Sequence, residues 1–138
     1  MNDEFFMTLA VEEAIKAYKE NEVPVGAIIV KDGKVIAKGH NKRETLNSPI
    51  AHAEIIAIEE ASRQLKNWRL YGCELYVTLE PCPMCAGAIL QSRIAKLHIG
   101  TFDENTGACG SVINIVQNYN LNHFLEVNGI MIIDVVKF

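Results

Sequence analysis

Two short motifs contain the residue types that bind metal ions and move protons. His52 and Glu54 form the first, and Cys82 and Cys85 belong to the second, which reads Glu-Pro-Cys-Pro-Met-Cys over residues 80–85. Each motif lies at the predicted start of a helix. Cysteines three positions apart place their sulfurs on one face of a first helical turn, where both can bind the same ion.

The spacing of His52 and Glu54 restricts how they can be used. On a continuing helix, side chains two positions apart point about 200° away from each other, so both can address one ion only from the first turn. If the two helix starts converge on one zinc ion, His52, Cys82 and Cys85 fill three tetrahedral positions. The fourth stays open for water, which is typical of a catalytic site, and Glu54 would be the base beside it.

Other zinc and thiol chemistries remain as alternatives. The histidine pair of the His-Glu-x-x-His proteases is absent from the sequence. A redox role for the Cys-x-x-Cys pair leaves His52 and Glu54 unexplained. A structural zinc would need a fourth ligand and gives Glu54 no role. The candidates for that ligand are Cys73, Cys109, His98 and His123.

The composition predicts one ordinary domain, residues 1–138. The chain has a net charge of −4, 49% hydrophobic and 22% charged residues, which excludes a general electrostatic binder of nucleic acid. No apolar run approaches the roughly 20 residues of a membrane span. Acidic residues occupy the N-terminal segment where a signal peptide carries positive charge, so we expect a cytoplasmic protein without disulfides and no membrane association.

Several elements must position the two motifs. Apolar residues at helical spacing predict a first amphipathic helix; they are Met7, Ala10, Val11, Ala14, Ala17 and Tyr18. The runs 25–30 and 35–39 flank Asp32-Gly33 and predict a tight hairpin. Further along, the pattern predicts a helix over 51–65, a strand over 73–79, a helix from Pro81 to about Ser92, a strand over 95–100, a short helix over 111–117 and strands over 124–127 and 130–136. This alternation predicts an α/β fold with helices covering a mixed sheet.

Three further residues have structural interpretations. Trp68 is expected to anchor the core after the second helix, His98 to be buried in a strand, and Cys73 to be small apolar filling.

The motifs resemble a known family. His52-Ala53-Glu54 with Pro81-Cys82-Pro83-Met84-Cys85 is similar to the signature of the zinc nucleobase deaminases. Over about residues 5 to 129 the chain also resembles the bacterial tRNA-specific adenosine deaminases in order and spacing; the matching segments are 24–27, 40–41, 68–70, 75–80, 86–88, 92–94, 106–111 and 122–123. The resemblance implies a cytidine deaminase-like three-layer α/β/α sandwich with a mixed sheet of about five strands. It also implies a homodimer with active sites close to the interface.

The resemblance further implies an activity and a set of site residues. It implies hydrolytic deamination of adenosine to inosine at the wobble position of tRNA, with one Zn²⁺ per subunit on His52, Cys82 and Cys85. Glu54 would take a proton from water and return it during loss of ammonia. The implied substrate contacts are Asn41 to the purine, the backbone of Ala53 and Pro81 at its reacting edge, Val25 as an apolar wall, and Asp103, Asn122 and His123 at the anticodon arm.

The chain departs from that family where RNA is held. Phe102, Asn105 and Phe124 stand where related enzymes often carry basic residues, and the run 130–136 replaces an expected helix with aromatic and basic side chains. Fewer phosphate contacts would weaken tRNA binding. Two alternatives therefore stay open: a deaminase of a free nucleobase or nucleoside, such as guanine or cytosine, and a non-catalytic zinc-binding accessory subunit. The presence of Glu54 argues against the second.

Overall fold

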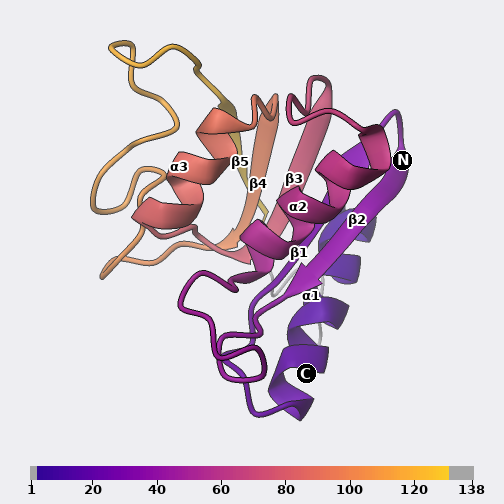
Figure 1. Cartoon of the computed structure of the whole chain (residues 1–138). Coiled ribbons are helices and arrows are strands. Elements are labelled where there is room, and N and C mark those ends of the chain that lie inside the picture. The colour runs from indigo at the N-terminus through magenta and orange to yellow at the C-terminus, as the bar shows by residue number, and fades with distance from the viewer. Residues whose placement is uncertain (1–2, 131–138) are drawn as a thin grey trace.

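The computed structural model describes residues 3–130 and contains a five-stranded sheet between helices (Figure 1). Along the chain the elements are α1 (Asp3–Lys19), β1 (Gly26–Lys31), β2 (Lys34–His40), α2 (Ala53–Leu65), β3 (Cys73–Leu79), α3 (Pro83–Gln91), β4 (Lys96–Thr101) and β5 (Glu126–Gly129). The strand over 73–79 agrees with its predicted bounds, and most other predicted elements differ by one or two residues.

The sheet is mixed, as predicted. Its order is β2-β1-β3-β4-β5, with β1 antiparallel to both β2 and β3, and with β3, β4 and β5 parallel. The predicted hairpin joins β1 to β2. Its turn residues Asp32 and Gly33 have φ of 52° and 75°, the left-handed conformation that a tight hairpin turn of this kind requires.

Helices cover both faces of the sheet, which confirms the predicted three-layer α/β/α sandwich (Figure 1). Ile28 and Val30 of β1 pack with α1, whereas Ala27 and Ile29 of the same strand pack with α2. Because β1 is buried on both faces, it is a continuous apolar run rather than an alternating one.

The two ends of the sheet carry different structures. The carboxyl ends of β2, β3 and β4 lie with the starts of α2 and α3, and we call this the site end. The β1–β2 turn and the connections 66–72 and 92–95 lie at the opposite end, which we call the far end. Open α/β sheets bind ligands beyond the carboxyl ends of their strands, so the site end is where a functional site is expected.

Gly39 brings α2 close to the sheet. A Cβ atom at this position would overlap the carbonyl oxygen of Ala53 and come within 2.9 Å of the backbone nitrogen of Ala57. Because Gly39 has no side chain, the first turn of α2, which follows His52, can lie directly on β2.

Some predictions from the sequence were wrong. Residues 111–117 form turns and bends instead of a short helix. Pro83, not Pro81, occupies the first turn of α3. Trp68 is 52% exposed and is not a core anchor. Of the predicted strand 130–136, residues 131–136 lie outside the described residues. Within residues 3–130, no helix is long and apolar enough to cross a bilayer.

Candidate metal centre and its pocket

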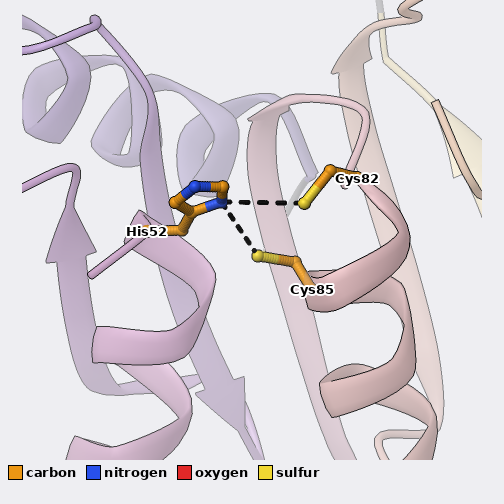
Figure 2. Close-up of side chains that lie close together, drawn as sticks. All are labelled: His52, Cys82 and Cys85. Atoms are coloured by element: carbon orange, nitrogen blue, oxygen red, sulfur yellow. Dashed lines mark hydrogen bonds between the residues drawn. The ribbon is translucent and has the colours of Figure 1, made fainter. Parts of the chain in front are cut away.

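His52 and Cys82 occupy equivalent positions at the starts of two helices. His52 is the N-cap residue of α2 and Cys82 is the N-cap residue of α3, both in extended backbone conformation. N-cap side chains commonly accept a hydrogen bond from the helix backbone, but neither of these does so. Both side chains are instead directed at each other across the site end of the sheet (Figure 2).

The distances fit a tetrahedral zinc ion. Nδ1 of His52 lies 3.7 Å from Sγ of Cys82 and 3.3 Å from Sγ of Cys85 (Figure 2). With Zn–S bonds of about 2.3 Å and Zn–N bonds of about 2.0 Å, a tetrahedral ion separates these ligand types by about 3.5 Å. All three ligand atoms lie within 4.8 Å of one another. The three side chains at this site therefore fit a zinc ion.

No fourth protein ligand completes this set among the described residues. The group of His, Cys, Asp and Glu atoms within 4.8 Å consists of His52, Cys82 and Cys85. His98 is fully buried and lies 2.7 Å from Glu74 and 3.1 Å from Asn128, within a separate group near α1. A structural site of four protein ligands therefore finds no support in this part of the chain.

Glu54 lies beside the three candidate ligands. It is the second residue of α2 and is 4% exposed. Burial raises the pKa of Glu54 to about 7, and the charge of Cys82 adds to this increase, while hydrogen bonds from its own backbone N–H and from Cys85 oppose it. A bound divalent cation would lower the pKa of Glu54. The side chain is thus positioned to exchange a proton with a group bound at the centre.

The two thiols differ in acidity. A hydrogen bond from Cys85 lowers the pKa of Cys82 to about 5, against the effect of burial. The same hydrogen bond and burial raise the pKa of Cys85. The thiolate of Cys82 forms readily at the start of α3, and a cation beside both sulfurs would favour deprotonation of Cys85.

A pocket of about 140 Å³ opens over the centre. Its inner end includes the buried Glu54 and the half-buried His52 and Cys82, and its exposed mouth includes Arg43 and Thr106. The complete lining consists of Val23, Val25, Asn41, Arg43, His52, Ala53, Glu54, Leu79, Glu80, Cys82, Asp103 and Thr106. Apolar walls with a few convergent polar groups are typical of a small-molecule or cofactor site.

Asn41 presents a defined hydrogen-bonding group to this pocket. The backbone N–H of Arg43 donates to Oδ1 of Asn41 over 3.0 Å. Because an N–H can only donate, the atom facing it must be the amide oxygen. The amide NH₂ is therefore the end of Asn41 that can donate to a ligand.

The structure brings together some predicted site residues and separates others. Val25, Asn41, Ala53 and Asp103 line the pocket together with His52, Glu54 and Cys82, whereas Cys85 is buried behind the lining. Pro81 lies next to Cys82, where its carbonyl oxygen accepts the N–H of Ala108 over 2.9 Å. Nε2 of His123 lies 2.8 Å from the carbonyl oxygen of Ile94, just before β4. His123 and its neighbour Asn122 therefore belong to the far end and do not line the pocket.

Sequence reasoning did not identify five of the lining residues, which are Val23, Arg43, Leu79, Glu80 and Thr106. Arg43 follows Asn41 by two positions and Glu80 directly precedes Pro81, so proximity to a predicted site residue was the available signal in both cases. Thr106 begins segment 106–111, so its family resemblance was the available signal there.

Comparisons with known proteins give a consistent result. The family described as "Cytidine and deoxycytidylate deaminase zinc-binding region" matches residues 1–101. A tRNA-specific adenosine deaminase from Bacillus subtilis is 50% identical over 125 residues, which span 91% of this chain and 78% of the relative. A solved structure described for A-to-I editing by tRNA:A34 deaminases at the wobble position of transfer RNA has a TM-score of 0.87 and 44% identity, over 91% of this chain and 96% of that one. A guanine deaminase from Bacillus subtilis has a TM-score of 0.72 and 34% identity, over 88% of each chain.

Proposed function

The chain belongs to the cytidine and deoxycytidylate deaminase zinc-binding family, and from this premise we propose that it is a zinc-dependent aminohydrolase that converts adenosine to inosine at the wobble position of tRNA. The observation that carries the proposal is the convergence of His52, Cys82 and Cys85 at the inner end of a pocket that Glu54 also lines. The most similar proteins described above, a tRNA-specific adenosine deaminase and a tRNA:A34 deaminase structure, support adenosine in tRNA as the substrate.

The residues of the centre divide the reaction between them. His52, Cys82 and Cys85 would hold zinc, which when bound activates a water molecule for attack on the base. Glu54 would take a proton from that water and deliver it to the ring nitrogen beside the attacked carbon. It would then carry the second proton, from the hydroxyl added at that carbon, to the amine, which leaves as ammonia. Its burial keeps bulk water away from this proton transfer.

The remaining pocket residues would orient the purine. The amide NH₂ of Asn41 is directed to donate to an acceptor on the base, because its oxygen is already bonded to the N–H of Arg43. Val25 and Leu79 would supply apolar walls, and the backbone of Ala53 and Pro81 would frame the reacting edge. These contacts would fix the base in its plane beside Glu54 and the three candidate ligands.

Contacts with the rest of the tRNA would begin at the mouth of the pocket. Arg43 and Asp103 lie there with opposite charges, and we assign them to the nucleotides that flank the flipped adenosine. We assign Asn122 and His123 to contacts with the anticodon arm outside the pocket. A tRNA substrate places the activity in the cytoplasm, and a single domain over residues 1–138 would carry it.

We also propose a homodimer. Segment 112–124 exposes five large apolar side chains, which are Val112, Ile113, Tyr119, Leu121 and Phe124. A concentration of exposed apolar residues is typical of an interaction surface. Light scattering on the purified protein should give twice the mass of the 15.3 kDa chain, and a monomeric mass across micromolar concentrations would contradict this assignment.

A panel of substrates tests the proposed function. Zinc-loaded protein is incubated with an RNA hairpin of the anticodon arm that has adenosine at the wobble position, and separately with free adenosine, guanine and cytosine. A hairpin with guanosine at the wobble position is the matched control. Ammonia release and inosine in the adenosine hairpin, measured by mass spectrometry, are the expected result. Deamination of a free base with an unchanged hairpin would favour the free-nucleobase alternative, and no activity on any substrate would favour an accessory subunit.

A further inference from the structure

The carboxylate of Glu80 is surrounded by hydrogen-bond donors from one loop. Oε1 accepts the backbone N–H of Asp103 over 2.9 Å and the hydroxyl of Ser111 over 2.5 Å. Oε2 accepts the backbone N–H groups of Cys109 and Ser111 over 3.0 and 3.1 Å. Glu80 is 3% exposed, so these donors replace water around the charge. Residues 103–111, which we call the rim loop, are thus gathered around one side chain.

Backbone contacts attach the same loop to the segment before the metal ligands. The N–H of Ala108 in the loop donates to the carbonyl oxygen of Pro81 over 2.9 Å. Before the loop begins, the N–H of Glu80 donates to the carbonyl oxygen of Thr101, the last residue of β4, over 2.8 Å. Cys82 follows Pro81 along the chain. Any displacement of the rim loop relative to Cys82 must therefore break bonds to residues 80 and 81.

Gly107 allows the carboxylate to enter the loop. A Cβ atom on Gly107 would overlap Cδ and Oε1 of Glu80 and lie 2.5 Å from the carbonyl oxygen of Asp103. The loop therefore encloses the Glu80 side chain only because position 107 has no side chain of its own.

The rim loop carries part of the pocket mouth. The side chain of Asp103 accepts the N–H groups of Asn105 and Thr106 over 2.9 and 3.2 Å and the Thr106 hydroxyl over 2.7 Å. Asp103 and Thr106 both line the pocket. We propose that Glu80 is a positioning residue that fixes the rim loop to the Cys82 segment and so sets the mouth of the pocket, where the RNA enters, at a constant distance from the metal centre.

The proposal depends on the negative charge of Glu80, not only on its size. A carboxylate offers two acceptor oxygens, whereas a carboxamide offers one acceptor and an NH₂ group that can only donate. In Glu80→Gln, two of the loop donors would face that NH₂ group. Donors that lose a charged acceptor in a buried place are costly, so the loop should rearrange although the side chain keeps its shape.

The experiment combines a measurement on the loop with a measurement on the substrate. Amide hydrogen exchange by NMR reports on the N–H groups of Asp103, Cys109 and Ser111, and steady-state kinetics on the adenosine hairpin separate KM from kcat. The variants are Glu80→Gln and the milder Ser111→Ala, which removes only the hydroxyl donor. Glu126→Gln, the same chemical change at an exposed carboxylate of β5, is the matched control. Metal analysis verifies that each variant still holds zinc.

We expect Glu80→Gln to exchange these amides at least tenfold faster and to raise KM roughly tenfold, the scale of one lost hydrogen bond to a charged group, with a smaller change in kcat. Ser111→Ala should raise the amide exchange rates and KM by smaller factors. Glu126→Gln should have the exchange rates and KM of the wild type. Unchanged amide exchange in both loop variants, or a loss confined to kcat with KM unaltered, would overturn the proposal. The inference rests on the proposed function for its kinetic part. If the wild type does not deaminate the hairpin, that function fails, and amide exchange alone decides whether Glu80 fixes the loop.

Discussion

Nδ1 of His52 lies 3.7 Å from Sγ of Cys82, and the two residues are the N-caps of different helices. The backbone N–H groups and the dipole at each helix start favour negative charge. Two such helix starts facing each other lower the cost of forming thiolate and of stabilising negative charge in a reaction. The metal centre therefore depends on the relative position of α2 and α3, not on either helix alone.

Removing one thiol should remove the metal. Cys85→Ala is expected to reduce zinc from about one ion per chain to a small fraction, because two remaining ligands bind far more weakly. Its melting temperature should also fall, since metal bound only by the folded state stabilises that state. Metal analysis and thermal unfolding, each with and without a chelator, measure this. Cys73→Ala, at a buried cysteine outside the ligand set, should keep its zinc. A Cys85→Ala protein with full zinc content would contradict the assignment.

Glu54→Gln should separate chemistry from metal binding. The amide cannot take a proton from water, so the rate of deamination is expected to fall by about 10²- to 10⁴-fold. Zinc content should stay at the wild-type level because Glu54 is not in the ligand set. Ammonia release under saturating substrate measures the rate. Glu60→Gln, on the same helix and paired with Arg63, serves as the control; wild-type activity in Glu54→Gln would exclude Glu54 as the proton carrier.

Asn41→Asp should weaken substrate binding while leaving the local turn in place. A carboxylate still accepts the N–H of Arg43, but it has no NH₂ to offer to the purine. We expect KM for the adenosine hairpin to rise about 10- to 100-fold, the size of a lost hydrogen bond in a buried site. Asn41→Ala loses both interactions and should lower the melting temperature as well. Equal KM values for Asn41→Asp and the wild type would remove Asn41 from the substrate contacts.

Two glycine substitutions should change stability in opposite directions. Gly39→Ala would push α2 away from β2, and overpacking of this kind costs about 1–3 kcal/mol. Because the first turn of α2 follows His52, zinc affinity should fall with stability. Gly87→Ala adds a Cβ in α3 with no atom within 4 Å and should stabilise the fold by about 0.5–1 kcal/mol. Urea unfolding measures both, and equal midpoints would contradict the close approach at Gly39.

The stability of the fold at acidic pH should depend on Glu13. Burial raises the pKa of Glu13, but hydrogen bonds from Lys16 and His40 outweigh it and bring the pKa below the ordinary 4.5. A carboxylate with a lowered pKa in the folded state stabilises the fold above the unfolded value, and this stabilisation is lost as the pH falls through the folded value. The melting temperature of Glu13→Gln should therefore lie below that of the wild type above about pH 5, and the difference should shrink below pH 4.5. A constant difference down to pH 3 would contradict the ion-pair explanation; the exposed Glu12→Gln is the control.

Local signals in the sequence account for the parts that were predicted well. Asp32-Gly33 alone indicates the hairpin turn, and the apolar pattern of 73–79 indicates β3 with its observed bounds. The ligand motifs are also local, because each lies within one helix start. Their convergence needed only the assumption that both starts reach the same end of the sheet.

Long-range contacts explain what the sequence could not predict. Segment 111–117 is apolar enough for a helix, but its backbone is bonded to the rim loop, as in the bonds from Val112 to Gly107 and from Ile115 to Ala108. Trp68 is held on the surface, where the Arg69 guanidinium lies 4.2 Å from the ring centroid. The partners of Glu80 are 23 to 31 residues away, so no local pattern marks its role.

The separation of the site end from the far end has a consequence for how such a chain can vary. Connections at the far end, such as Asp32-Gly33 and residues 66–72, contribute nothing to the pocket lining. The exposed positions of these connections, unlike the buried Leu70, tolerate insertions and fused segments. Changes in loop length, affinity tags or inserted domains can therefore accumulate at these two connections, whereas at the site end a change of a single residue in length would shift the ligands out of register.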